Sequence, residues 1–245
     1  FCLYTAISLP SYRELDTMPQ DPHDRHPLND APQRHPLSDV PSSAEEELII
    51  PPRPQPVRVN VAQAQTPSLT LILVAVNVAI FALGFLLPSL GNQIFLFGMN
   101  YPPLVIENLQ VYRLLTAMFL HASAAHIFFN AYALYVIGSN LERIYGPTRF
   151  AIIYFLGGLT GSLLSVALGA YDVPSVGASG GVFAVFAAEA LHVYLHRESY
   201  GAAAQGFLLN RAILLGINLM LGFLPGSRID NWGHIGGLIG GAILA

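Results

Sequence analysis

The sequence contains no lysine, so all eleven of its basic residues are arginine. Only 11% of its 245 residues are charged, and the formal net charge at pH 7 is -4. Proteins that bind nucleic acids carry clustered basic charge, and the eleven arginines are instead scattered along the chain. The composition therefore argues against a nucleic-acid partner.

Cysteine is nearly absent as well, because Cys2 is the only one in the sequence. A single thiol cannot close a disulfide within the chain. It also cannot surround a metal ion with several thiolates, as structural zinc sites require. The cysteine count thus excludes both a disulfide-stabilised scaffold and a thiolate metal centre.

Apolar residues make up 53% of the sequence, and most of them lie in long runs after Pro67. The complete runs approach the ~20 residues that a membrane-spanning helix needs. No period-two alternation occurs, so helices are favoured over the strands of a barrel. Residues 68–245 are thus predicted to form an all-α, polytopic membrane helical bundle of at least six transmembrane helices. The six runs cover residues 69–88, 115–138, 149–169, 178–195, 207–224 and 232–245.

The two ends of the chain differ from this pattern. Residues 1–67 are rich in proline and polar residues, and such a segment cannot bury enough apolar surface to offset the entropy of ordering it. We therefore expect a disordered N-terminal tail. The last apolar run stops at Ala245, so we expect the full-length protein to continue, with room for a seventh helix.

Arginine placement predicts the orientation of the bundle. Four arginines fall toward the same side as the N-terminal tail, whereas the opposite loops hold two. Because basic loops stay on the cytosolic side of a membrane, the N-terminus is predicted to be cytosolic. The four are Arg143, Arg149, Arg197 and Arg211.

Unusual polar residues cluster near the outer ends of three predicted helices. The second run carries His121, His126 and Asn130, the fourth opens with Ser179, and the sixth opens with His234. His126 and Asn130 are four residues apart and share one helix face, from which His121 would be rotated away. Polar side chains at this depth are tolerated when they face a wet cavity, so we predict a water-containing pocket here.

Glycines accompany the serine and the last histidine. Gly177 and Gly180 flank Ser179, and Gly237 and Gly241 follow His234 on the same helix face. Such small-xxx-small patterns let membrane helices approach closely. Close approach would bring an imidazole within ~2.6 to 3.2 Å of the serine hydroxyl, as a nucleophile and its general base require.

A metal-dependent alternative is open at this point. The histidines of the second run could bind a metal ion, which would make the protein a transporter or a metalloprotease. His192 and His196, with Glu189 nearby, could bind a metal on the inner side, but we favour their interpretation as solvent-facing residues at a helix end. No His-Glu-x-x-His sequence is present. We interpret Asn77 and Asn218 as formers of hydrogen bonds between helices.

From about Leu69 to its end, the chain resembles the rhomboid family of intramembrane serine proteases. Five family motifs occur in order: an aromatic-arginine pair, a histidine followed by a second histidine and an asparagine, a Gly-xxx-Glu-xxx-Gly turn, a Gly-x-Ser-Gly serine motif, and a histidine with spaced glycines. Here they are Tyr112-Arg113; His121, His126 and Asn130; Gly138, Glu142 and Gly146; Gly177 to Gly180; and His234, Gly237 and Gly241.

The resemblance implies roles for these residues. Ser179 would be the nucleophile and His234 its base, with no third triad residue, no metal and no other cofactor. His126, Asn130 and the Ser179 backbone N–H would form the oxyanion hole. The remaining motif residues would support this site, namely His121, Gly177, Gly180, Gly237, Gly241, Glu142, Arg113, Tyr112 and Phe183.

Two of these supporting positions depart from the family pattern. Tyr112 stands where the family has tryptophan, and Phe183 where members often have a tyrosine packed on the histidine. The implied substrates are single-span or other transmembrane proteins within the lipid bilayer. A catalytically inactive rhomboid-like protein that binds such clients is the alternative within this family.

Overall fold

The computed structural model describes residues 66–245. The disordered tail predicted for residues 1–67 lies almost entirely outside the described residues, so it stays a prediction. The described part consists of helices joined by loops, and its only β structure is one isolated β-bridge between Asn100 and Ser175. The predicted all-α class is confirmed for residues 66–245.

Ten α-helices make up this part of the chain. They are α1 (Ser68–Leu86), α2 (Pro88–Gly98), α3 (Pro102–Ile106), α4 (Arg113–Thr116), α5 (Ala124–Ala133), α6 (Ser139–Leu168), α7 (Ser179–Leu195), α8 (Arg197–Tyr200), α9 (Ala202–Gly222) and α10 (Asn231–Leu244). A 3-10 turn at Ala117–Phe119 follows α4, and a π-helical turn at Leu134–Gly138 joins α5 to α6.

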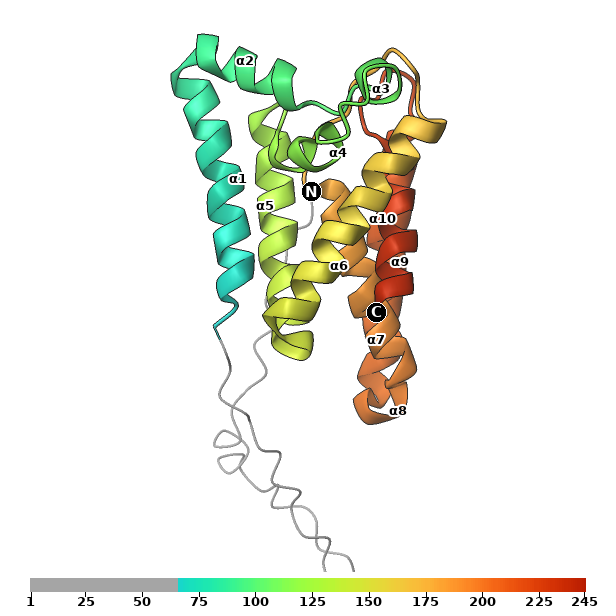
Figure 1. The fold of residues 1–245 in the computed structure, drawn as a ribbon. Coiled ribbons are helices and arrows are strands. Elements are labelled where there is room, and N and C mark those ends of the chain that lie inside the picture. Colours follow the sequence, from blue (N-terminus) through green and yellow to red (C-terminus); the bar gives the residue numbers. More distant parts are fainter. Residues whose placement is uncertain (1–65) are drawn as a thin grey trace, which may run out of the picture. The chain divides into compact units, whose positions relative to one another are not determined.

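Within residues 66–245, three helical stretches are long and apolar enough to cross a membrane: Ser68–Leu86, Ala124–Leu168 and Ala202–Gly222. The second stretch has 45 residues. If straight, it would be about 68 Å long, twice the ~30 Å hydrocarbon core. It is broken at Gly146, whose φ is 77°, and Pro147 follows. Figure 1 shows α5 and the part of α6 after this break running in opposite directions.

The start of the second predicted run was wrong. Residues 115–123 end α4, form the 3-10 turn and then leave helical geometry, and α5 begins only at Ala124. Ser123 sets this start, because its hydroxyl accepts a hydrogen bond of 3.2 Å from the His126 backbone N–H. Ser is a preferred N-cap residue, since it satisfies one of the unpaired N–H groups of the first turn.

The apolar-run analysis missed the three short helices between α1 and α5. Arg113 holds this segment together, because its side chain donates to the carbonyl oxygens of Leu96 at 2.9 Å and Met99 at 3.0 Å, at the end of α2. A third bond goes to the Gln110 side chain at 2.7 Å. Tyr112 stacks on Phe97 with ring centroids 4.9 Å apart. The Tyr112-Arg113 pair therefore fastens α2 to α4.

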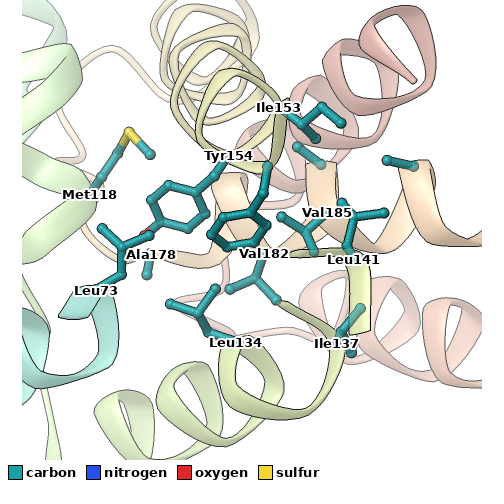
Figure 2. Close-up of a cluster of buried hydrophobic side chains, with 13 residues drawn as sticks. Leu73, Met118, Leu134, Ile137, Leu141, Ile153, Tyr154, Ala178, Val182 and Val185 are labelled. Atoms are coloured by element: carbon teal, nitrogen blue, oxygen red, sulfur yellow. The ribbon is translucent and has the colours of Figure 1, made fainter. Parts of the chain in front are cut away.

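The hydrophobic core lies between α1, α6, α7 and the turn that joins α5 to α6. Figure 2 shows Leu73 of α1, Met118 of the 3-10 turn and Val182 of α7 in one cluster with Tyr154 of α6. Phe150 and Tyr154 are fully buried. Their burial anchors the second half of α6 against α7, which carries the predicted nucleophile.

Glycines replace large side chains where α6, α7 and α10 meet. A Cβ atom built on Gly161 of α6 would lie 2.6 Å from the carbonyl oxygen of Gly233 and 3.3 Å from Cα of Gly180. One built on Gly237 would lie 3.2 Å from the same Cα of Gly180. The backbones of the three helices are therefore in direct contact, as the small-residue pattern predicts.

Glu142 closes the start of α1 from a distant position in the chain. Its carboxylate accepts hydrogen bonds from the backbone N–H groups of Leu69 at 3.0 Å and Thr70 at 2.7 Å, and from the Thr70 hydroxyl at 2.7 Å. These groups are among the first-turn donors that a helix leaves unpaired, and a negative charge also complements the positive helix end. Glu142 thus ties α6 to α1.

Replacing this carboxylate should loosen α1. In Glu142→Gln the amide group would face three donors with one acceptor oxygen, so we expect a loss of about 1 to 3 kcal/mol of stability. Thermal unfolding in detergent, followed by circular dichroism, measures this. Glu198→Gln, at an exposed position in α8, is the control. Equal unfolding midpoints for the two variants would contradict the capping role.

The glycine contact makes a second prediction about stability. A methyl group at Gly241 would lie 2.5 Å from Cα of Ala184 and 2.6 Å from its carbonyl carbon, so Gly241→Ala should cost about 1 to 3 kcal/mol. Gly216 of α9 has no atom within 4 Å of such a group, and Gly216→Ala should stabilise the protein through helix propensity. Unfolding midpoints that move in the same direction would refute the contact.

Candidate active site

Ser179 is the first residue of α7, and the preceding glycine sets its position. Gly177 has a φ of 134°, which L side chains rarely adopt. A Cβ atom there would lie 2.7 Å from Nε2 of His126 and 3.6 Å from Oγ of Ser179. The glycine therefore lets the His126 ring and the Ser179 hydroxyl approach the same point.

The start of α7 is held by the segments around it. The backbones of Asn100 and Ser175 exchange two hydrogen bonds of 3.0 and 2.9 Å, and the Gly177 N–H donates to the Ala117 carbonyl at 2.9 Å. Within the described residues, no side chain caps the N-terminus of α7. Its first N–H groups, including that of Ser179, therefore remain available to an acceptor at the positive helix end.

His234 lies in the first turn of α10, buried against α7. Its ring stacks on Phe183 with centroids 4.1 Å apart and an interplanar angle of 10°. Phe183 is one helical turn after Ser179, so both residues share a face of α7. Nδ1 of His234 is buried and has no hydrogen-bond partner among residues 66–245. The imidazole is therefore oriented by stacking and not by a carboxylate.

Ser179 and His234 flank the point where α7 and α10 touch through Gly180 and Gly237. The hydrogen bonds of residues 66–245 do not include one between the Ser179 hydroxyl and the His234 ring. Rotation of the serine side chain costs little, because it has no other hydrogen bond to break within the described part. The structure thus brings the two residues to one helix contact without joining them.

The three polar residues of the second run also meet at α7. Asn130 donates its side-chain amide to the carbonyl of His126 at 3.0 Å, along its own helix. His121 precedes α5, and Nε2 of its ring accepts the Ala178 N–H at 3.5 Å. The His121 and His126 rings lie 5.0 Å apart. The expectation that His121 points away was wrong, because it assumed a helix through residues 120–123.

Ser179 borders a small cavity. Its volume is about 30 Å³, and a water molecule needs about 10 to 15 Å³ by the same measure. Three polar residues that the sequence analysis did not identify line it, namely Ser162, Ser175 and Asp230. Asp230 carries a recognisable N-cap signal, whereas the two serines come from distant segments that only the fold brings together.

Glu189 and the inner-side histidines, His192 and His196, have other partners than a metal ion. Glu189 binds Arg211 of α9 at 2.9 Å, and His192 stacks on His196 with centroids 4.4 Å apart. Among residues 66–245, no group of three or more His, Cys, Asp or Glu side chains is arranged to hold a metal ion. In the described residues, neither histidine pair therefore belongs to a set of ligands that the metal-dependent alternative would need.

The interpretation of Asn218 was wrong, and the side-chain amide nitrogen of Asn77 also donates within its own helix. Each side-chain amide donates to the carbonyl four residues earlier in its own helix, at 2.8 Å for Asn77 and 2.9 Å for Asn218. Asparagine readily bonds to nearby backbone carbonyls, so a polar residue in a membrane helix need not reach a neighbouring helix.

The sequence of this chain is similar to known proteins of one family. A family model described as the Rhomboid domain matches residues 108–245, which is more than half of the chain. The chain is 42% identical over 149 residues to "Rhomboid protease GluP" of Bacillus subtilis, covering 61% of this chain and 28% of that protein. It is 36% identical over 148 residues to "Rhomboid-like protease 1" of Toxoplasma gondii, covering 59% and 49%.

A third relative differs in its description. "Inactive RHOMBOID-like protein 8" of Arabidopsis thaliana is 34% identical over 142 residues, covering 58% of this chain and 39% of that protein. The chain thus spans about a quarter to a half of the length of these curated relatives. The extent of the family match and the apolar helices together identify the chain as an integral membrane protein of the rhomboid family.

Proposed function

We propose that this protein is an intramembrane serine endopeptidase that cleaves peptide bonds in or near transmembrane segments of other membrane proteins. The observation that carries this proposal is the placement of Ser179 and His234 on either side of the contact between α7 and α10. Ser179 borders a cavity large enough for water, and the His234 ring stacks on Phe183, one helical turn further along α7.

In the proposed reaction, Oγ of Ser179 attacks the carbonyl carbon of the scissile peptide bond while His234 takes the hydroxyl proton. The C–N bond then breaks as His234 delivers that proton to the leaving amine. Water attacks the resulting acyl-enzyme ester, with His234 again taking a proton and returning it to Oγ of Ser179. The pair acts as a dyad, because His234 Nδ1 has no partner in residues 66–245.

Three groups are proposed to stabilise the oxyanion of the tetrahedral intermediate. The Ser179 N–H lies at the uncapped start of α7, and Nε2 of His126 lies close to Gly177. The Asn130 amide donates to the His126 carbonyl, so it would have to rotate toward the intermediate. Donors aimed at a developing charge in a water-poor site lower the barrier more than they would in water.

The membrane arrangement is part of the proposal. We infer six passes, made by α1, by the two halves of Ala124–Leu168, and by α7, α9 and α10, with the N-terminus on the cytosolic side. Residues 68–245 would form the rhomboid-like domain. The substrates would be single-span or other transmembrane proteins, which reach the site from the lipid bilayer.

A catalytically inactive, client-binding protein is the second candidate. Two observations favour it: the Ser179 hydroxyl does not bond to His234, and the Asn130 amide is occupied within its own helix. Labelling by a fluorophosphonate separates the candidates, because the reagent modifies a serine only when a base activates it. Labelling of Ser179 supports the protease, and its absence supports the binding protein.

Removing the nucleophile should abolish cleavage. Purified protein in liposomes should cleave a single-span reporter, and Ser179→Ala should reduce cleavage to background while the unfolding midpoint is unchanged. Ser199→Ala, which removes an exposed hydroxyl in α8, should cleave like the unmodified protein. Cleavage retained by Ser179→Ala would exclude this serine as the nucleophile.

Removing the Asn130 amide should slow turnover and leave folding intact. Loss of one oxyanion-hole donor costs about 2.7 to 4 kcal/mol, so Asn130→Ala should lower kcat by about 100- to 1000-fold. Asn218→Ala is the matched control, since its amide also donates to a carbonyl of its own helix. Equal kcat values for the two variants would show that Asn130 has no role in the oxyanion hole.

A further inference from the structure

We propose that Asp230 is a positioning residue for catalysis, whose carboxylate stabilises the protonated form of His234 during the reaction. The proposal rests on the proposed function. The two roles of Asp230, as a helix cap and as a charge, can be separated experimentally.

Two helix N-termini converge on the candidate site. Ser179 begins α7, and His234 lies in the first turn of α10, which begins at Asn231. Each helix start carries partial positive charge from its unpaired N–H groups. This field favours an oxyanion on the substrate. It also opposes the positive charge that His234 acquires when it takes the Ser179 proton.

Asp230 is the residue in the best position to offset this field. Its side-chain Oδ1 accepts the Gly233 N–H at 2.9 Å, and its backbone carbonyl accepts the His234 N–H at 3.1 Å. These two bonds hold the carboxylate one helical turn before the imidazole, a spacing at which helix side chains are neighbours. Asp230 also lines the cavity that borders Ser179.

The other groups around His234 do not supply negative charge. α7 presents Phe183 and the Ser179 hydroxyl, and α6 contributes glycines and Ser162 near the cavity. From α5, His126 adds an imidazole, which cannot be negative. Among the cavity-lining residues of the described part, Asp230 is the one carrying a charge. Because Nδ1 of His234 has no partner there, Asp230 acts through space and not as a triad acid.

The test is the pH dependence of cleavage by Asp230→Asn. Asparagine caps a helix as well as aspartate does, so the substitution removes the charge and keeps the cap. Without the carboxylate, His234 binds a proton less readily. We expect the acidic limb of the kcat/KM profile to move down by about 0.5 to 1 pH unit and the plateau to fall several-fold.

Three controls define the outcome. Asp230→Glu keeps the charge, so its acidic limb should stay near that of the unmodified protein. Asp172→Asn removes an exposed carboxylate from the loop between α6 and α7 and should leave the profile unchanged. Asp230→Ser is a second uncharged variant that keeps a helix cap. It replaces Asp230→Asn if that variant unfolds, and its pH profile should show the same shift.

Fluorophosphonate labelling of Ser179 provides a second readout, because its rate depends on the same base. An acidic limb that stays in place in both uncharged variants would reduce Asp230 to a helix cap and overturn the proposal. The unmodified protein distinguishes this from failure of the proposed function. The protease assignment, and this inference with it, fails if the unmodified protein shows no cleavage and no labelling that depends on Ser179.

Discussion

The direct backbone contact between α6, α7 and α10 is the constraint on which the candidate site depends. Gly161, Gly180 and Gly237 let the three helices touch, and a side chain at Gly161 or Gly237 would push the helices apart. Ser179 and His234 are the immediate neighbours of this contact, so their separation follows from the helix spacing. A hydroxyl and an imidazole on helices packed through leucine would stand too far apart to exchange a proton.

The unpaired N–H groups at helix starts are capped by side chains in some helices and left open in α7. Glu142 occupies the first-turn donors of α1, and Asp230 occupies one in α10. In the described part, α7 has no side-chain cap, although Ser179 is its first residue. The donors that Glu142 and Asp230 satisfy in α1 and α10 are thus left open in α7, where a substrate oxygen would need them. The uncapped helix costs stability, and the core around Tyr154 and Phe150 offsets that cost.

Much of the fold could be predicted from the sequence, because a membrane helix must satisfy its own backbone and therefore appears as a continuous apolar run. The runs at 178–195 and 232–245 match α7 and α10 closely. The helices α2 to α4 lacked this signal, since Arg113 holds them through carbonyls of α2 that are distant in sequence. The position of His121 was misjudged because the Ser123 cap was overlooked, although a capping serine is visible in sequence.

The candidate site could also be predicted only in part. Its serine and histidines could be identified from residue type and spacing, because few polar groups are tolerated in membrane helices. The cavity could not be predicted, since Ser162 and Ser175 come from different segments and meet only in the fold. The charge balance was hidden for a related reason. Two helix ends that favour an anion also penalise a cation, so a base held between them needs a fixed negative charge nearby. Such a requirement becomes visible only when both helix starts are seen to converge.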